Sequence, residues 1–313
     1  MSKLRPTRLA YGETLARLGN LQDNLIVMDS DLSKSTMTSL FAEKFPNRFF
    51  NAGIAEANMM SVAAGLATAG KTVFASTFAV FAAGRAFEQI RNSIAYSNLN
   101  VKVAASHAGI SVGEDGASHQ MNEDIALMRV LPNMTVISPA DYNETVSAVR
   151  IASETGGPFY IRLCRLPADD IFPENYQMQL GKGVILRDGS DVTLISTGLM
   201  LHKSITAAEI LERQGIKARV VNIHTIKPID SELIINSAEK TGAVVTVEEH
   251  SVIGGLGSAV AEVICQYAPT KMKIIGINDV FGRSGKPEDL FRLYGLDSQS
   301  IADSVCAFLN NIL

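Results

Sequence analysis

The 313-residue chain has few of the residues that would place it in a disulfide-linked or zinc-binding class. Its three cysteines, Cys164, Cys265 and Cys306, lie far apart, and no Cys-x-x-Cys spacing occurs. A disulfide framework or a structural zinc site needs more cysteines at closer spacing. The pattern therefore favours a reducing compartment.

Long apolar runs and an excess of positive charge are also missing. The alanine-rich runs are short and broken by polar residues, so none is predicted to span a bilayer, and residues 1–6 lack the apolar core of a signal peptide. The formal net charge of −4 provides no basic surface for nucleic acid or for an anionic membrane. We expect a cytoplasmic protein that binds neither nucleic acid nor membrane.

Short apolar runs alternate with segments of helical periodicity through the first half of the chain. Strands are predicted at 25–28, 48–51, 72–76, 101–106, 134–138 and 159–163. Helices are predicted at 9–18, 55–69, 82–96, 122–130 and 142–155. Apolar strands separated by helices predict a parallel sheet that is covered by helices on both faces.

The composition then changes between residues 166 and 191, where prolines, glycines and acidic residues indicate an exposed connector and a lead-in strand. A second alternation follows, with strands predicted at 192–196, 218–222, 243–247 and 273–277 and helices at 204–214, 231–240 and 257–267. The predicted fold class is α/β, with two parallel-sheet α/β domains at 1–172 and 191–313 and a connector at 173–190.

The segment 49–60 combines a short apolar strand, a turn at Gly53 and an alanine-rich helix with Glu56 in its first turn. A first-turn carboxylate usually complements the helix dipole. A buried carboxylate among small apolar residues would instead have a raised pKa and could act as an acid. Local sequence alone leaves both interpretations open.

Ligands of open parallel sheets bind beyond the carboxyl ends of the strands. The residues that follow the predicted strand 101–106 form a glycine-rich loop with two histidines, His107 and His119, and two acids, Glu114 and Asp115. Because two of the five histidines of the chain lie in this one loop, a functional loop is favoured over a solvated turn.

Two further pairs have a structural and a functional interpretation. Phe78 and Phe81, three residues apart at the start of a predicted helix, normally face a core, but they could form a flat slot for an aromatic heterocycle. Arg162 and Arg165, at the end of the predicted strand 159–163, could form surface ion pairs or bind a phosphate.

Several motifs together resemble the carboxyl-terminal half of the transketolase family. They are Asn51-Ala52-Gly53-Ile54-Ala55-Glu56, Ser76-Thr77-Phe78, Arg85-Ala86-Phe87-Glu88-Gln89-Ile90-Arg91, Gly113-Glu114-Asp115-Gly116-Ala117-Ser118-His119-Gln120, Ile226-Lys227-Pro228, Glu248-Glu249-His250, Gly254-Gly255-Leu256-Gly257 and Arg283-Ser284-Gly285-Lys286-Pro287. They occur in the family's order along nearly the whole chain. The resemblance implies a pyrimidine-binding domain, a C-terminal domain and thiamine diphosphate chemistry.

The resemblance also implies roles for individual residues. Glu56 matches the glutamate that hydrogen-bonds N1′ of the aminopyrimidine and thereby promotes loss of the thiazolium C2 proton. The remaining matches are the cofactor-binding residues Phe78, Phe81, Asp31 and Ile54, the catalytic histidines His107 and His119, and the substrate-binding residues Asp115, Arg165, Ser35 and Arg8. A histidine whose pKa lies near the working pH suits proton relay. The implied reaction transfers a two-carbon ketol unit between sugar phosphates of the pentose phosphate type.

The chain departs from the family pattern in three ways. Arg85 and its neighbours stand where many relatives have a further aromatic residue, and Ala117 stands where proline is common. No Gly-Asp-Gly, the usual start of the diphosphate and Mg²⁺ site, occurs anywhere in the chain. Mg²⁺ prefers oxygen ligands of this kind. We therefore expect no metal ligands here, a separately encoded N-terminal transketolase subunit that holds the Mg²⁺, and an α₂β₂ assembly.

Two other interpretations stay open at this point. The β subunit of a thiamine-dependent 2-oxoacid dehydrogenase shares the domain order and a similar glutamate, but it is not expected to carry Gly-Glu-Asp-Gly-x-x-His with a downstream arginine. A non-catalytic module with the same fold would have no physical need of Glu56, His107, Asp115 and His119 together.

Overall fold

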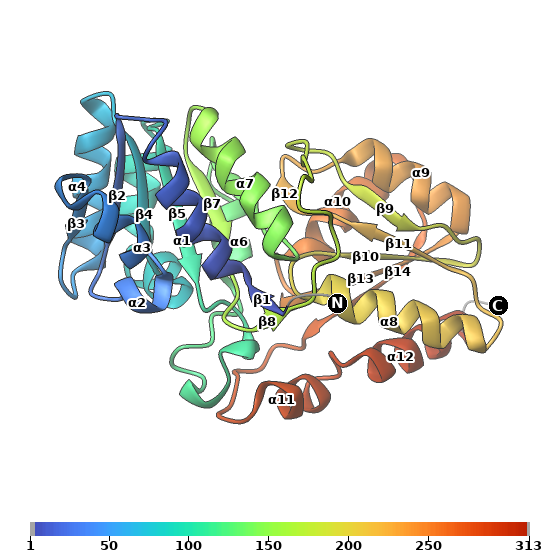
Figure 1. Ribbon diagram of the computed structural model, residues 1–313. Coiled ribbons are helices and arrows are strands. Elements are labelled where there is room, and N and C mark those ends of the chain that lie inside the picture. The colour runs from blue at the N-terminus through green and yellow to red at the C-terminus, as the bar shows by residue number, and fades with distance from the viewer. Residues whose placement is uncertain (1–3, 312–313) are drawn as a thin grey trace.

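The structure is a computed structural model that describes residues 4–311. Two α/β units lie side by side, one built on a seven-stranded sheet and the other on a five-stranded sheet (Figure 1). The predicted fold class is therefore confirmed. The outermost ends of the two predicted domains, residues 1–3 and 312–313, lie outside the described residues.

The first sheet has the strand order β12-β6-β7-β5-β4-β2-β3. Its strands are β2 (Leu25–Asp29), β3 (Phe49–Asn51), β4 (Thr72–Phe78), β5 (Val101–Ser106), β6 (Thr135–Ile137), β7 (Phe159–Arg162) and β12 (Thr225–Lys227). All neighbouring strands are parallel except β12 and β6. The central strands β2, β4, β5 and β7 are buried along their whole length, which explains their continuous apolar sequences.

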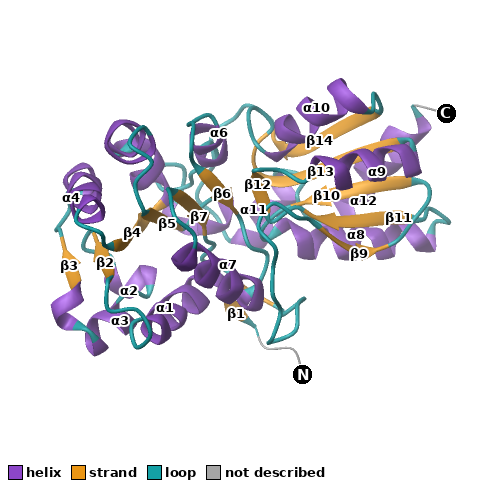
Figure 2. Cartoon of the chain, turned by 90° about the horizontal axis from the view of Figure 1, so that it is seen from above, coloured by secondary structure: helices purple, strands orange, loops and turns teal. Residues whose placement is uncertain are grey.

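Helices cover both faces of this sheet (Figure 2). One face carries α1 (Thr7–Leu18), α2 (Ser33–Thr36), α3 (Ser39–Lys44) and α7 (Tyr142–Glu154), and the other carries α4 (Glu56–Thr68) and α6 (Asp124–Arg129). The segment between β4 and β5 consists of η2 (Val80–Arg85), α5 (Phe87–Gln89) and η3 (Ile90–Ala95). A short ribbon of β1 (Arg5–Pro6) and β8 (Pro167–Ala168) and the turn η1 (Pro46–Arg48) complete the unit.

The second sheet has the order β14-β13-β10-β11-β9. Its strands are β9 (Val184–Arg187), β10 (Val192–Ser196), β11 (Ala218–Asn222), β13 (Ala243–Ser251) and β14 (Lys271–Ile277), and only β9 is antiparallel to its neighbour. The helices are α8 (Met200–Arg213), α9 (Ser231–Thr241), α10 (Leu256–Tyr267), α11 (Pro287–Leu293) and α12 (Ser298–Asn310). In Figure 2, α9 and α10 lie on one face and α8 and α12 on the other.

The two units share one buried core. A single apolar cluster contains Val103 of β5, Ile226 of β12, Val244 of β13 and Val260 of α10. β12 belongs in sequence to the second unit but pairs with β6 of the first sheet. The second unit is therefore packed firmly against the first.

Several sequence predictions need correction. Each predicted parallel sheet has one antiparallel edge strand. β9 is the predicted lead-in strand, whose direction was not predicted, and the three-residue strand β12 was too short to recognise. The predicted α-helix 82–96 begins earlier and contains wide turns with i→i+5 hydrogen bonds, such as Ala86 N to Phe81 O. α2, α3, α11 and α12 were not predicted.

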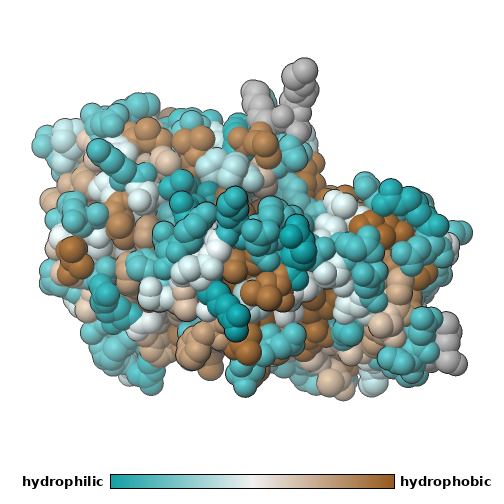
Figure 3. All heavy atoms as spheres, turned by 90° about the horizontal axis from the view of Figure 1, so that it is seen from below, coloured by the Kyte–Doolittle hydropathy of each residue, from teal (hydrophilic) through white to brown (hydrophobic). Residues whose placement is uncertain are grey.

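Seen from below, the surface mixes polar and apolar side chains, and apolar ones gather near the middle of this face (Figure 3). In the C-terminal unit the exposed large apolar residues include Val280, Phe281 and Leu293, which line a hollow of about 300 Å³. Among residues 4–311 no helix is both long enough and apolar enough to cross a membrane.

Candidate active site

The predicted site residues come from strand ends at one edge of the first sheet. β4 ends at Phe78 and β5 ends at Ser106, so the loop that begins at His107 starts beside Phe78. β3 ends at Asn51, and the chain turns at Gly53, where φ is +70°, before α4 begins at Glu56. A positive φ at this turn favours glycine. Parallel strands thus bring these segments together, as expected.

Glu56 is buried and charge-paired. Its side chain is 2% exposed, and Nη1 of Arg85 donates to its Oε2 over 2.8 Å. The guanidinium of Arg85 also lies over the ring of Phe81, 4.4 Å from the ring centre, while half of the Arg85 side chain remains exposed. Glu56 is therefore more than a solvated acid at a helix end, although its place in the first turn of α4 is as predicted.

Four aromatic rings form a compact cluster next to this pair. Phe78 stacks on His107 with ring centres 3.9 Å apart, and Phe78 and Phe81 lie nearly parallel at 5.9 Å. His119 presents its ring at a steep angle to Phe81 at 5.6 Å. The structure thus brings together five of the residues predicted for cofactor binding and catalysis, namely Glu56, Phe78, Phe81, His107 and His119.

His107 differs from the expected proton relay. It is buried, and burial lowers its pKa to about 3, assisted by the positive charges of Arg8 and Arg165. Its imidazole is therefore neutral at pH 7 and suits hydrogen bonding rather than proton relay at its own pKa. Its φ of +58° is unusual for a residue with a side chain, and such backbone conformations often occur at functional sites.

Two of the predicted phosphate-binding residues, Arg8 and Arg165, lie near enough to His107 to influence its charge. Arg165 donates to the carbonyl oxygen of Val112, and its Nη1 is 4.0 Å from the carboxylates of Glu114 and Asp115. Burial and the charge of Arg165 lower the pKa of Arg8, whose Nη1 donates to the carbonyl oxygen of Ser35. Arg8, Ser35, Arg165 and Asp115 therefore form a second group beside the ring cluster. Ser35 contacts Arg8 through its backbone and not through its hydroxyl.

Asp31 and Ile54 lie apart from both groups. The backbone N–H of Asp31 donates to Oδ1 of Asn51, and that oxygen also accepts from Gly53 N. The side chain of Ile54 is 78% exposed. Neither residue contacts the aromatic cluster through an interaction among the described residues, so their predicted cofactor role stays a prediction.

The sequence interpretation missed several residues that organise the site. Arg85 was noted because it stands where many relatives have an aromatic residue, but nothing in the sequence indicated that it pairs with Glu56. The buried Asp29 accepts hydrogen bonds from Leu32 N and from the hydroxyls of Ser33, Thr36 and Thr38, and thereby shapes the segment that carries Ser35. The buried Arg162 pairs with Asp124 and donates to the backbone oxygens of Met121 and Glu249, so its side chain is occupied by contacts within the chain.

Within residues 4–311, no group of three or more histidine, cysteine, aspartate or glutamate side chains is arranged to hold a metal ion. The second unit also approaches the site. The carboxylate of Glu249 accepts from Ser111 N in the loop that carries His119. Burial raises the pKa of Glu249 to about 7.

Comparison with known proteins agrees with this geometry. The family model described as transketolase, pyrimidine binding domain, matches residues 4–168, and the model of the transketolase C-terminal domain matches residues 181–301. The chain is 56% identical over 301 residues to a putative transketolase C-terminal section of Methanocaldococcus jannaschii, covering 95% of this chain and 94% of the relative. It is 42% identical over 303 residues to human transketolase, covering 96% of this chain but 48% of the relative. The chain thus spans about half the length of the human protein.

A solved structure described as a split gene transketolase, inactive β4 tetramer, superposes with a TM-score of 0.92 at 55% identity, covering 97% of this chain and 98% of that one. The chain therefore belongs to the transketolase family. Within the family it corresponds to the C-terminal section, with the pyrimidine-binding domain followed by the C-terminal domain, as in the Methanocaldococcus and split-gene relatives. The resemblance inferred from the motifs is confirmed.

Proposed function

We propose that this chain forms the pyrimidine and substrate side of a thiamine diphosphate site. Together with a separately encoded N-terminal chain, it transfers a two-carbon ketol unit from a ketose phosphate to an aldose phosphate. The observation that carries this proposal is the single cluster in which the buried Glu56 lies beside Phe78, Phe81, His107 and His119.

The residues present fit an aminopyrimidine. Such a ring needs an apolar face to stack on and a carboxyl group that shares a proton with its ring nitrogen N1′. Arg85 already makes both contacts, because its planar guanidinium lies over Phe81 and donates to Glu56 Oε2. Glu56 Oε1 accepts no hydrogen bond from the described residues. An aminopyrimidine can therefore replace the guanidinium at the same two surfaces when Arg85 moves aside.

When bound, thiamine diphosphate supplies an acidic ring carbon and an electron sink for cleaving and forming the carbon–carbon bond beside a ketose carbonyl. Glu56 would hold the pyrimidine nitrogen and its proton. The neutral His107 would donate hydrogen bonds to sugar hydroxyls or accept them. His119 contacts the same Phe78 ring on which His107 stacks. Arg165 and Arg8 would bind the sugar phosphate, because guanidinium groups match phosphate oxygens.

The diphosphate and Mg²⁺ are assigned to the partner chain, since the sequence has no Gly-Asp-Gly. Large apolar side chains are exposed on the strand, turn and helix that flank Glu56, namely Phe50, Ile54 and Val62, and a partner could cover them. The related split-gene protein is described as an inactive β4 tetramer. This supports self-association and a lack of activity without a partner, and the proposed complete assembly is α₂β₂ in the cytoplasm.

Reconstitution tests the proposal. The isolated chain is expected to show neither ketol transfer nor tight Mg²⁺-dependent thiamine diphosphate binding, and both should appear when the N-terminal chain is added. Full turnover by the isolated chain would contradict the half-site assignment. Donor assays with a ketose phosphate and with pyruvate separate a transketolase from a 2-oxoacid dehydrogenase subunit. Turnover of neither donor by the reconstituted complex would favour a non-catalytic module.

A further inference from the structure

The loop of residues 107–120, called the substrate loop below, is closed at its base. Gly109 N donates to Met121 O over 2.8 Å, and Ala108 and Met121 form an isolated bridge. Beyond this base the loop leaves the first sheet and extends towards α11 (Figure 1). Contacts with the second domain are therefore needed to fix the position of most of the loop.

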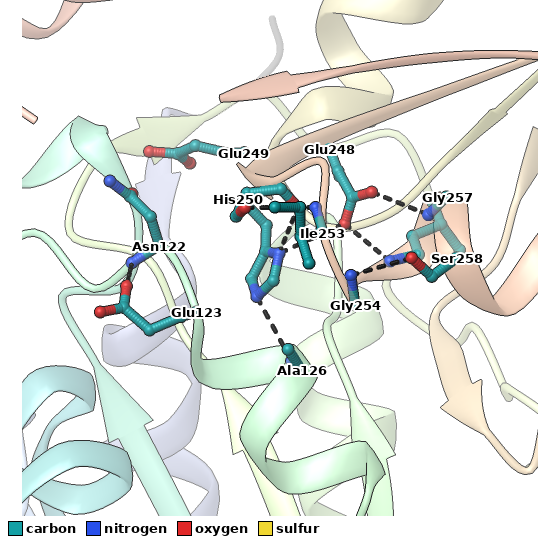
Figure 4. Close-up of polar contacts among 12 residues, drawn as sticks. Asn122, Glu123, Ala126, Glu248, Glu249, His250, Ile253, Gly254, Gly257 and Ser258 are labelled. Atoms are coloured by element: carbon teal, nitrogen blue, oxygen red, sulfur yellow. Dashed lines mark hydrogen bonds and ion pairs between the residues drawn. The ribbon is translucent and has the colours of Figure 1, made fainter. Parts of the chain in front are cut away.

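Strand β13 of the second sheet reaches the base of this loop. Ser251 N donates to Asn122 O over 2.7 Å, and Nη2 of Arg162 donates to the backbone oxygen of Glu249 over 2.8 Å. Glu248 and His250 point to one side of the strand and Glu249 points to the other (Figure 4). The two side chains on the first side hydrogen-bond to helices: Glu248 accepts from Gly257 N of α10, and His250 Nε2 accepts from Ala126 N of α6.

Glu249 is the anchor at the start of the substrate loop. Its side chain is buried, and its Oε1 accepts from Ser111 N. It lies so close to the backbone that a Cβ at Gly109 would be 2.4 Å from the Glu249 Cδ. Gly109 also has a φ of +78°, so a side chain there would meet both strain and a clash.

The segment 282–287 is a second anchor, at the far end of the loop. Nε2 of Gln120 donates to Arg283 O over 2.8 Å and to Gly113 O over 3.1 Å, so one amide joins the loop to the second domain. A Cβ at Gly116 would lie 2.3 Å from the Ser284 Oγ, and one at Gly113 would lie 3.2 Å from Pro287. Close backbone packing thus continues along the loop.

We propose that the C-terminal domain positions the substrate loop for ketol transfer, with Glu249 holding its start and the segment 282–287 holding its end. The catalytic role of the loop in ketol transfer rests on the proposed function. The anchoring itself does not, because it is a property of this chain. Glu249 is a positioning residue: it contacts Ser111 and Gly109, and its path to the reacting atoms runs through the loop that carries His107, Asp115 and His119.

The first test measures hydrogen exchange of the amides of residues 109–120 in the full chain, without partner or cofactor. Glu249→Ala removes the acceptor of Ser111 N, so exchange in this loop should be at least about tenfold faster than in wild type. Glu249→Gln keeps one side-chain oxygen as acceptor and should restore most of the protection. Pro287→Ala, a smaller change at the second anchor, should speed exchange around Gly113 and leave Ser111 protected.

The second test measures turnover in the reconstituted complex. Because small displacements of positioned groups can cost up to about 100-fold in rate, Glu249→Ala should lower kcat about 10- to 100-fold while thiamine diphosphate binding stays within about threefold. Glu249→Gln should recover most of kcat. Val305→Ala, in the core of the second domain, and Glu239→Ala, at an exposed site on α9, are controls that should leave loop exchange unchanged.

Unchanged loop exchange in Glu249→Ala would overturn the anchoring, whatever the activity. A loosened loop with unchanged kcat would overturn its role in transfer. If Glu249→Ala does not fold, Glu249→Asp, whose shorter side chain withdraws the carboxylate from Ser111 N, is compared with wild type by the same two measurements. Unchanged exchange around Gly113 in Pro287→Ala would overturn the second anchor. A wild-type complex without transketolase activity would instead contradict the proposed function, while the exchange data would still test the anchoring.

Discussion

The two sides of the candidate site differ in how completely their buried polar groups are satisfied by contacts within the chain. On the substrate-loop side, Glu249, Gln120 and the glycines of the loop are buried and make hydrogen bonds or close contacts across two domains. On the pyrimidine side, Glu56 is buried, the one charged partner that it has within residues 4–311 is the half-exposed Arg85, and the nearby Ile54 is exposed. The chain therefore completes the support of the substrate loop by itself, whereas the pyrimidine side keeps a half-exposed side chain that a ligand could displace.

This difference has a physical reason. A buried polar group that lacks a partner costs about 1–3 kcal/mol, so a region that is already closed must satisfy its own groups. Arg85 can satisfy Glu56 temporarily, because a long side chain that is half exposed can move into solvent. The backbone contacts of the substrate loop have no such freedom. We expect perturbations of the two sides to have different effects.

The largest expected effect is on the pyrimidine side. Glu56→Gln should lower kcat of the reconstituted complex by about two orders of magnitude or more, because the carboxylate acts before every later step. Thermal unfolding of the isolated chain should change little, since Gln keeps the size of the side chain. Near-normal turnover in this variant would remove Glu56 from its assigned role.

Arg165→Ala should have the next largest effect. Losing one charge-assisted contact of about 1.5–3 kcal/mol should raise KM for phosphorylated sugars about 10- to 100-fold. Unphosphorylated sugars serve as the internal control and should be affected much less. Because Arg165 also donates to Val112 O in the loop, an equal loss for both kinds of sugar would show that its role is structural.

A smaller effect is expected from Arg85→Ala. If the guanidinium must leave Glu56 and Phe81 before the pyrimidine binds, removing it should tighten thiamine diphosphate binding to the reconstituted complex by a few fold, by relieving competition. Calorimetry or fluorescence titration measures this affinity directly. Arg91→Ala is a matched control, because Arg91 lies on the neighbouring helical turn and contacts Asn92. Much weaker cofactor binding in Arg85→Ala would mean that Arg85 remains in the bound site.

The smallest expected effect is on the pH dependence of stability, through a buried carboxyl group that joins the two domains. Glu144 on α7 accepts from Ala140 N and from Asn222 Nδ2 of β11, and burial raises its pKa to about 8. Since the folded chain then binds more protons than the unfolded chain between about pH 4.5 and 8, the free energy of unfolding should fall as pH rises through this window.

In wild type Tm should fall between about pH 5.5 and 7.5, and in Glu144→Gln this fall in Tm should be smaller by about 2–4 °C. Differential scanning calorimetry of the isolated chain measures the slope. Glu154→Gln, an exposed acid at the end of the same helix, should leave the slope unchanged. A slope that stays the same in Glu144→Gln would show that this carboxyl does not carry the pH dependence.

Sequence reasoning succeeded where local pattern reports directly on burial. The continuous apolar strands β2, β4, β5 and β7 were predicted with ends close to those observed, and parallel pairing then brought the segments after β3, β4 and β5 to one edge. It failed for β12, a three-residue strand, and for the wide turns of η2, because neither has a distinctive periodicity.

The sequence by itself determined the α/β class, the order of the buried parallel strands and the membership of the Glu56 and histidine cluster, since these follow from periodicity and from motifs along the chain. Only the tertiary structure decided that Arg85 pairs with Glu56, 29 residues away, and that Glu249 holds Ser111, 138 residues away. It also decided that His107 is neutral, because its pKa depends on burial and on the charges of Arg8 and Arg165. Such contacts depend on how distant elements pack, which periodicity within one element does not report.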